Sequence, residues 1–238
     1  MTFTYLITGA SRSLGLGYTR DLLASSDQVR VVAAVRNPDS AKQLDSVKQQ
    51  YGDRLYLVKC DVTDAASAQH AADELAKSDF AKLDAVIANA GVLGGGWKPS
   101  TQFSEDDLSY NLKTNLYGVI NTINAFLPLL KQGQGKQIFV TSSILGSIGG
   151  PMGHVASAYS ISKAAVNMYT VKLARELAEE GFTVVPFHPG YVKTDMNNAE
   201  GDLETDEATK LATNNVFLKA TKADNAKFMV FDGTTLPW

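Results

Sequence analysis

Short apolar runs that are rich in β-branched residues alternate along the chain with longer segments of helical periodicity. Seven such runs are typical of β-strands, at residues 3–8, 29–35, 55–60, 84–89, 136–142, 183–187 and 227–231. Helical patterns lie between them, at residues 14–26, 38–51, 64–79, 104–131, 157–180 and 205–219. This alternation predicts an α/β protein with a doubly wound, seven-stranded parallel sheet and helices on both faces of the sheet.

The composition limits the functions that such a sheet could serve. The 238 residues include no linker, internal repeat or low-complexity tract, so we expect a single domain over residues 1–238. A net charge of −3 without a block of Lys and Arg argues against nucleic-acid and membrane partners. One cysteine and three scattered histidines give no metal-binding spacing, so no metal is expected. Without a signal peptide or an apolar run of about 18 residues, a cytoplasmic protein is expected.

A glycine-rich segment, TGASRSLGLG at residues 8–17, directly follows the first predicted strand and leads into the first helix. The amino end of a helix offers free amides and the positive end of the helix dipole, and glycines let the backbone approach a ligand closely. In the first turn of a doubly wound sheet, this arrangement indicates a dinucleotide site. Because Gly9 and Gly15 lie six residues apart, the spacing differs from G-x-G-x-x-G, and a plain structural turn is the alternative.

The end of the second predicted strand indicates which dinucleotide is bound. An acidic residue about 20 positions after the glycines would bind the 2′-hydroxyl of the adenosine ribose. Val35 stands at that position, Arg36 follows it, and Arg12 lies within the glycine-rich turn. Two guanidinium groups without a carboxylate favour a 2′-phosphate, and therefore NADPH or NADP⁺ over the NAD forms. The alternative is that both arginines are ordinary solvated surface residues.

Two helical segments carry polar residues whose spacing suggests chemistry. Tyr159 and Lys163 lie four residues apart and share a helix face, where the ammonium group would lower the pKa of the phenol and improve it as a proton donor or acceptor. Asn115 interrupts the apolar face of the fourth predicted helix, whose start is marked by the capping pair Ser104 and Asp107. A buried amide needs partners, so Asn115 is either a locally satisfied core residue or part of a polar site.

Six motifs occur in an order that resembles the short-chain dehydrogenase/reductase family over nearly the whole chain. They are TGASRSLG, ANAG at 88–91, Asn115, Ser143 within SSILG, Tyr159-x-x-x-Lys163 and HPGYVKTD at 188–195. The ending KFMVFDGTTLPW further resembles the sniffer and C-factor-like carbonyl reductases, a subgroup with fungal ketoreductase-like members. The resemblance implies a Rossmann fold and an oxidoreductase that uses a nicotinamide cofactor.

The resemblance also implies a role for each matching residue. Tyr159 would give a proton to the carbonyl oxygen, and Lys163 would lower the Tyr159 pKa and hold the nicotinamide ribose. Ser143 would position the substrate oxygen, and Asn115 would hold a water in a proton relay. Ser142 fits less well than Ser143, because only Ser143 precedes x-x-Gly. The residues implied to bind the cofactor are Gly9, Ser11, Arg12, Ser13, Leu14, Gly15, Arg36, Asp61, Val62, Asn89, Ala90, Gly91, Tyr159, Lys163, Pro189, Gly190, Val192 and Thr194.

Two features depart from the family pattern. Ser13 stands where the family commonly has glycine, so its Cβ requires an ordinary φ or some strain. The spacing from Ser143 to Tyr159 is longer than is common in the family. Three segments, at about 92–103, 147–156 and 196–220, would border the substrate, and the glycines at 94–96 would make the first of them pliable. Candidate substrate contacts within them are Trp97, Met152 and His154.

The function expected from these features is an NADPH-dependent carbonyl reductase that transfers a hydride to an aldehyde or ketone. One alternative is an NAD-dependent alcohol dehydrogenase of the same family. Another is a non-catalytic NADP-binding redox sensor, which would not need a competent proton donor. The resemblance also implies a homodimer or homotetramer, formed largely by the 104–131 and 157–180 helices.

Overall fold

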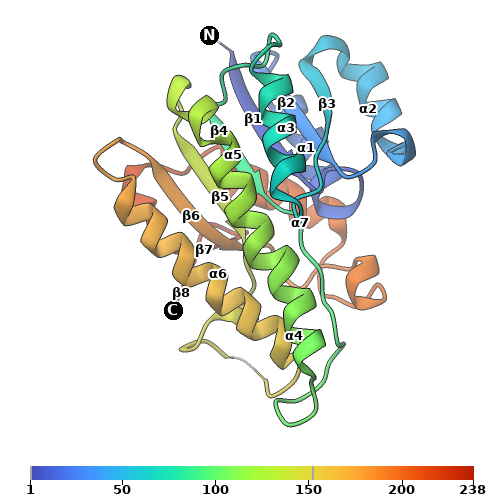
Figure 1. The fold of residues 1–238 in the computed structure, drawn as a ribbon, viewed down its shortest axis with the longest axis vertical. Helices are drawn as coiled ribbons and strands as arrows, with labels where there is room; N and C mark the ends of the chain where they lie inside the picture. Colours follow the sequence, from blue (N-terminus) through green and yellow to red (C-terminus); the bar gives the residue numbers. More distant parts are fainter. Residues whose placement is uncertain (1, 152) are drawn as a thin grey trace.

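The computed structural model describes residues 2–151 and 153–238, and Figure 1 shows a sheet with helices packed against it. The strands are β1 Phe3–Thr8, β2 Val29–Val35, β3 Leu55–Lys59, β4 Ala85–Ala88, β5 Gln137–Thr141, β6 Thr183–His188, β7 Phe228–Val230 and β8 Thr235–Leu236. The α-helices are α1 Ser13–Ser25, α2 Gln43–Tyr51, α3 Ala65–Leu75, α4 Glu105–Leu112, α5 Gly118–Gln132, α6 Ser157–Glu176 and α7 Thr205–Ala212. None of the described helices is long and apolar enough to cross a lipid bilayer.

The strands lie in the order β3-β2-β1-β4-β5-β6-β7-β8, and the first seven in sequence are parallel. The doubly wound parallel sheet is therefore confirmed, but it has eight strands rather than seven. The additional strand, β8, pairs antiparallel with β7 and is only two residues long, too short for an alternating pattern to reveal. The order reverses between β1 and β4, which opens a crevice at the carboxyl ends of these two strands.

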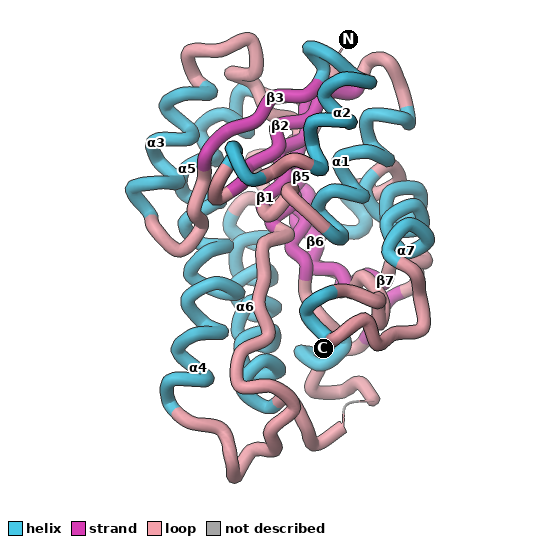
Figure 2. The backbone as a smooth tube through the Cα atoms, turned by 90° about the vertical axis from the view of Figure 1, so that its right-hand side faces the viewer, coloured by secondary structure: helices cyan, strands magenta, loops and turns pink. Residues whose placement is uncertain are grey.

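Both faces of the sheet are buried under helices (Figure 2). Alternate strand residues point to opposite sides, so each face receives one apolar set. Leu6, Val32 and Ile138 pack in the core on the side of α3, α5 and α6. Tyr5 and Phe139 belong to the other core, which includes residues of α1 and α2 and of the segment that follows α7. Burial on both sides explains why the strands read as continuous apolar runs.

The predicted 104–131 helix is interrupted. The capping box of Ser104 and Asp107 is present at its start, as the sequence predicts. After Leu112, however, one π-helical turn over Lys113–Tyr117 separates α4 from α5, and Asn115 lies in this turn. Such turns insert a residue into a helix and frequently mark functional sites.

The Tyr18 hydroxyl supplies a stability prediction. The ring is fully buried and packs edge-on against Phe217, with ring centres 5.0 Å apart, but its hydroxyl has no hydrogen-bond partner among the described residues. Tyr18→Phe is therefore expected to raise the free energy of unfolding by about 1 kcal/mol, because an unpaired polar group leaves the core. Urea denaturation measures this change. Tyr56→Phe is the control and should lose stability, since that hydroxyl donates to Glu74 at 2.8 Å; a destabilised Tyr18→Phe variant would contradict the prediction.

Candidate active site

A cleft of about 1520 Å³ lies at the carboxyl ends of the strands, at the point where the strand order reverses. It is lined by the glycine-rich turn, the segments that follow β2, β3, β4, β5 and β6, two side chains of α6, and Tyr110, Lys113 and Thr114 from α4 and the turn after it. All of the residues that the sequence predicts as cofactor-binding or catalytic line this cleft, except Asn115. The fold thus brings these predicted residues together from seven separate stretches of the chain.

The glycine-rich turn is built to receive an anion. The amino end of α1 has neither a side-chain cap nor an acidic residue in its first turn, so its free amides and dipole face the cleft. Gly9 adopts a left-handed φ of 68°, and a Cβ on Gly15 would lie 2.3 Å from the carbonyl oxygen of Gly9. Ser13 takes a left-handed φ of 49°, so this residue accepts the strain that a Cβ brings there.

Thr8 holds the two central strand ends together beneath this turn. Its hydroxyl accepts hydrogen bonds from the amides of Asn89 and Ala90, at 3.0 and 3.1 Å. The Asn89 side chain in turn donates to the Thr8 carbonyl oxygen at 3.0 Å. These bonds extend the pairing of β1 and β4 beyond the sheet and set the floor of the crevice.

The two predicted arginines lie exposed at the rim of the cleft. Arg36 forms no ion pair within the described part of the chain, whereas Arg12 contacts Asp195 at 3.3 Å. Asp61, the other carboxylate of the lining, accepts from the amide and hydroxyl of Thr63. Both lining carboxylates are therefore engaged by protein groups, and none replaces the acid that is missing at the end of β2.

Tyr159 and Lys163 project from α6 into the cleft, near Ser143 at the end of β5. Lys163 is 4% exposed, and its Nζ donates to the Thr141 carbonyl oxygen at 2.8 Å and lies 5.6 Å from the centre of the Tyr159 ring. Ser143 interacts with the Tyr159 hydroxyl. The neighbouring Ser142 donates its hydroxyl proton to Asn167 instead, at 2.6 Å, and is buried.

Burial dominates the proton affinities of this group. It raises the pKa of Tyr159 to about 12, with the Ser143 contact acting in the opposite direction, and it lowers the pKa of Lys163 to about 8. Lys163 is not among the causes of this shift, so the predicted lowering of the Tyr159 pKa by its ammonium is not seen in this structure, where Lys163 donates to Thr141.

Asn115 is fully buried, and its amide is satisfied by protein atoms. Its oxygen accepts from the Val92 amide at 2.8 Å, and its nitrogen donates to the Val92 carbonyl oxygen at 2.9 Å and to the Ser162 hydroxyl at 3.0 Å. These bonds suffice to explain an amide on this apolar face, so the side chain links the segment after β4 to α6.

The predicted substrate segments differ in whether they line the cleft. Trp97 of 92–103 lines the cleft, but no described residue of 147–156 does, His154 included, and Met152 lies outside the described residues. The 196–220 segment is not a loop throughout, since α7 and a π turn occupy 205–217. Sequence reasoning missed Asn37, Ser40, Lys42 and Gln43, which line the cleft because the predicted 38–51 helix is broken before α2. It also missed Tyr110, which lies on α4, and did not name Tyr191 or Met196, although they fall in the 188–195 motif and the predicted 196–220 segment.

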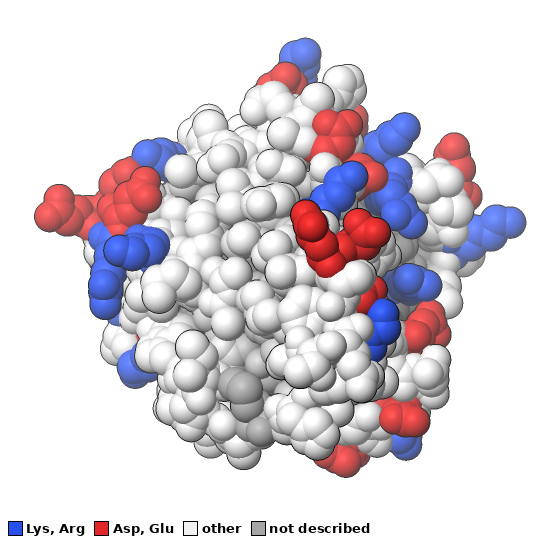
Figure 3. Space-filling model, turned by 60° about the horizontal axis from the view of Figure 1, so that its bottom comes forward, with Lys and Arg blue, Asp and Glu red and all other residues white. Residues whose placement is uncertain are grey.

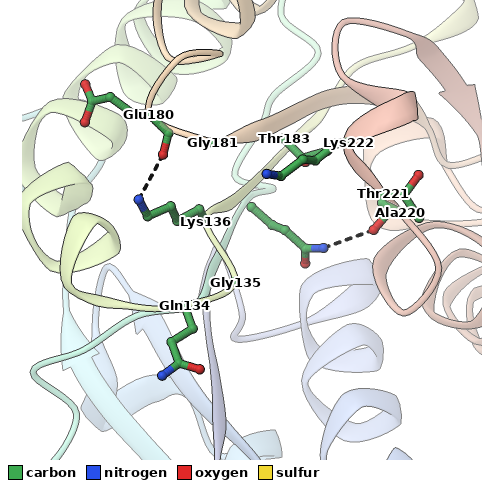
Figure 4. A pocket seen from close by; sticks show the side chains of 10 residues that line it. Gln134, Gly135, Lys136, Glu180, Gly181, Thr183, Ala220, Thr221 and Lys222 are labelled. Atoms are coloured by element: carbon green, nitrogen blue, oxygen red, sulfur yellow. Dashed lines mark hydrogen bonds between the residues drawn. The ribbon is translucent and has the colours of Figure 1, made fainter.

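A second, smaller hollow of about 440 Å³ lies at the opposite edge of the sheet, where β5 and β6 begin (Figure 4). Its polar groups largely bind one another: Lys136 donates to the Glu180 carbonyl oxygen at 2.8 Å, and Gln137 donates to that of Ala220 at 3.1 Å. None of the predicted catalytic or cofactor-binding residues lines this hollow. The larger cleft is therefore the candidate active site.

Comparison with known proteins agrees with this geometry. Residues 4–205 match the sequence profile of the family described as short chain dehydrogenase. An oxidoreductase of Schizosaccharomyces pombe, named as uncharacterized, is 31% identical over 252 residues, which cover 98% of this chain and 97% of the relative. The solved structure of the carbonyl reductase Sniffer of D. melanogaster has a TM-score of 0.91 and 28% identity, with 100% of both chains covered. The NADPH-bound carbonyl reductase from chicken fatty liver has a TM-score of 0.86 and 30% identity, with 100% of this chain and 99% of that chain covered. The chain therefore belongs to the short-chain dehydrogenase family of oxidoreductases.

Proposed function

We propose that this protein is an NADPH-dependent carbonyl reductase that reduces an aldehyde or ketone, with Tyr159 as the general acid. The observation that carries the proposal is one cleft with a neutral, partly buried phenol beside Ser143 and Lys163, and with Arg12 and Arg36 at its rim, of which Arg36 has no ion-pair partner among the described residues. The carbonyl reductase names of the Drosophila and chicken proteins, the second with NADPH bound, support the same reading.

The residues present fit a nicotinamide dinucleotide phosphate. The uncapped end of α1 with Gly9 and Gly15 suits the pyrophosphate, and Arg12 and Arg36 suit a 2′-phosphate. A Cβ on Gly91 would come within 3.3 Å of Asn115 Oδ1 and 3.6 Å of Lys163 Nζ, so glycine keeps space open beside the ammonium. When bound, the nicotinamide supplies the hydride. The remaining residues of this set are Ser11, Ser13, Leu14, Asp61, Val62, Asn89, Ala90, Tyr159, Pro189, Gly190, Val192 and Thr194.

The protein's own contribution is a proton and two hydrogen-bond donors. A carbonyl oxygen that gains negative charge during reduction would accept the Tyr159 proton and a hydrogen bond from Ser143. Because burial raises the pKa of Tyr159 to about 12, the phenol keeps its proton at neutral pH. A donor suits carbonyl reduction, whereas alcohol oxidation needs the phenolate as a base.

Initial rates with NADPH and NADH test the cofactor assignment. We expect a clear preference for NADPH, and Arg36→Ala should raise the KM for NADPH about 10–100-fold with little effect on NADH, because a charge-assisted phosphate contact is lost. Lys222→Ala, on the far edge of the sheet, is the control. A preference of the wild type for NADH would refute the assignment and favour the dehydrogenase.

We infer that residues 1–238 act as one catalytic domain and that the protein forms a homodimer or homotetramer. Support for the assembly comes from exposed apolar side chains on the helices that the family resemblance implicates, among them Tyr117 in the π turn and Ile161 and Met168 on α6. Such side chains on one helical layer are typical of an interface. Light scattering of the eluting protein measures the molar mass, and a monomeric mass would refute this inference.

A further inference from the structure

We propose that the substrate is a neutral carbonyl compound with a bulky aromatic group, and that Trp97, held in place by Asn111, is the side chain against which this group packs. The proposal rests on the proposed reductase function and goes beyond it by naming the substrate class and two further residues. Trp97 would contact the substrate, and Asn111 would act as a positioning residue.

Large apolar side chains gather in the cleft without being covered. Ten such residues are exposed in the described part of the chain, and four of them line the cleft: Trp97 at 41%, Tyr110 at 55%, Tyr191 at 40% and Met196 at 43%. Exposed aromatic area in a concave site is typical of ligand contact, since packing within the protein would otherwise have buried it. These side chains provide an apolar surface that a hydrophilic substrate would leave unused.

The segments next to Ser143 and Tyr159 carry little charge. Ile144 and Leu145 follow Ser143, and Leu93 and Trp97 lie on the loop after β4. Because β5 and β6 are neighbours, the residues after β6, including Tyr191, lie beside those after β5. Figure 3 shows a broad area without Lys, Arg, Asp or Glu on the face that this view brings forward, with charged side chains toward its margins. An uncharged substrate matches the apolar part of this end, where the Lys163 ammonium is already bonded to the Thr141 carbonyl oxygen; Lys113 also lines the cleft.

The loop that carries Trp97 is tied by hydrogen bonds to the helical segment that follows it. Asn111, which is fully buried, accepts from the Gly94 amide and donates to the Gly94 carbonyl oxygen, both at 3.0 Å. Asn115 makes the same pair of bonds with Val92. Two amides one helical turn apart thus bind alternate residues of the loop, as a neighbouring strand would; we call this arrangement the amide ladder. These bonds tie Gly94 to α4, whereas Gly95 and Gly96 keep the left-handed φ values of 76° and 63° that favour glycine.

A second anchor follows Trp97 directly. The carbonyl oxygen of Lys98 accepts from the Ser157 amide at 3.1 Å, and the Lys98 ammonium contacts Asp107 at 2.7 Å. Ser157 lies two residues before Tyr159 on the same helix. The backbone is therefore anchored on both sides of Trp97, at Gly94 by the amide ladder and at Lys98 by the start of α6, and Trp97 lines the cleft. A wall that is ordered before binding adds affinity, because the substrate does not have to order it.

A matched pair of diketones tests the proposal. 1-Phenyl-1,2-propanedione and 2,3-butanedione share the reacting group and differ in the phenyl ring. We expect the wild type to have a kcat/KM at least about tenfold higher for the phenyl compound. Trp97→Ala should lower that kcat/KM about tenfold through KM and leave 2,3-butanedione within about twofold, because only the ring contact is lost. Trp97→Phe should recover most of the loss, and Leu218→Ala, an exposed apolar residue outside the cleft, is the control.

Asn111→Ala tests the positioning role. It should raise the KM for the phenyl compound by about the same factor as Trp97→Ala, with a much smaller change in kcat, whereas general unfolding would lower kcat for both diketones. Binding gives an independent readout. Trp97 is one of two tryptophans, so in a Trp238→Phe background the phenyl diketone should quench the remaining fluorescence, and 2,3-butanedione should quench it much less at equal concentration.

The outcomes separate the two proposals. If none of the carbonyl compounds supports oxidation of NADPH by the wild type, the proposed function fails. If it reduces both diketones equally well, and Trp97→Ala changes both alike, the reductase stands and the assignment of Trp97 is refuted. If Asn111→Ala leaves the KM for the phenyl compound unchanged, the amide ladder has no positioning role.

Discussion

Tyr159→Phe is expected to lower kcat for carbonyl reduction at least about 10³-fold while the Kd for NADPH changes less than about threefold. General acids typically contribute 10²–10⁴-fold, and the phenol is the one group of the cleft that combines a retained proton with a position beside Ser143. Phenylalanine keeps the ring and removes only the hydroxyl. The loss therefore reports the missing proton rather than a change in packing.

The fold should tolerate this change. The Tyr159 ring is partly buried in the cleft wall, and the lost partner, Ser143, keeps its other hydrogen bond, from the Leu145 amide at 3.2 Å. We expect the unfolding midpoint to stay within about 2 °C of the wild type. Tyr169→Phe, on the same helix but outside the cleft, is the matched control and should retain full turnover.

Stopped-flow absorbance at 340 nm and NADPH titration by fluorescence measure the two quantities separately. Turnover by Tyr159→Phe near the wild-type rate would remove the proposed general acid. If instead the wild type binds NADPH tightly but reduces no carbonyl compound, the redox-sensor alternative gains support, because that function needs binding alone.

Patterns with a local physical cause could be predicted from the sequence. The strands could be predicted from β-branched runs, because both faces of the sheet are buried. Tyr159 and Lys163 could be placed on one helix face, because four residues complete about one helical turn. The glycine-rich turn could be predicted, because a close approach such as that of Gly15 to Gly9 excludes a Cβ. In each case, the residues that carry the pattern lie near one another in the sequence.

Features that depend on distant partners could not be predicted. The π turn at Asn115 accompanies bonds to Val92 and Ser162, which lie 23 and 47 residues away. Likewise, Arg12 meets Asp195 across 183 positions. The burial of Tyr159 belongs to the same class, because a spacing of four residues indicates that an ammonium is near, whereas only the folded structure shows the desolvation that raises the Tyr159 pKa.

Lys163→Met is expected to make the protein more stable and less active. Burial lowers the pKa of Lys163 from 10.5 to about 8, so the folded state holds its charged form at a cost of about 3 kcal/mol at pH 7. Methionine removes that cost but also removes the hydrogen bond to the Thr141 carbonyl oxygen, which contributes about 1 kcal/mol to the free energy of unfolding. The net gain of about 2 kcal/mol should raise the unfolding midpoint by roughly 4–8 °C, whereas kcat/KM should fall about 10²-fold or more.

The pH dependence identifies the cause of that gain. The folded-state pKa lies below the unfolded value, so the penalty is complete below about pH 8 and disappears as the pH rises through 8 toward 10.5. The stability difference between Lys163→Met and the wild type should therefore shrink by about 1.4 kcal/mol for each pH unit above 8. Comparing the two proteins cancels the contributions of other titrating groups. Wild-type reductase activity should decline over the same range, if the ammonium is the active form.

Urea denaturation at pH 7 and pH 9 measures both effects, with Lys172→Met as the control, because this exposed lysine lies on the same helix. The control should change stability by less than about 0.5 kcal/mol at either pH. A Lys163→Met variant that is less stable than the wild type at pH 7 would mean that the ammonium is well solvated or well paired in the fold. A variant that is both stabilised and fully active would show that the cleft works without this charge, and the role assigned to Lys163 would then be abandoned.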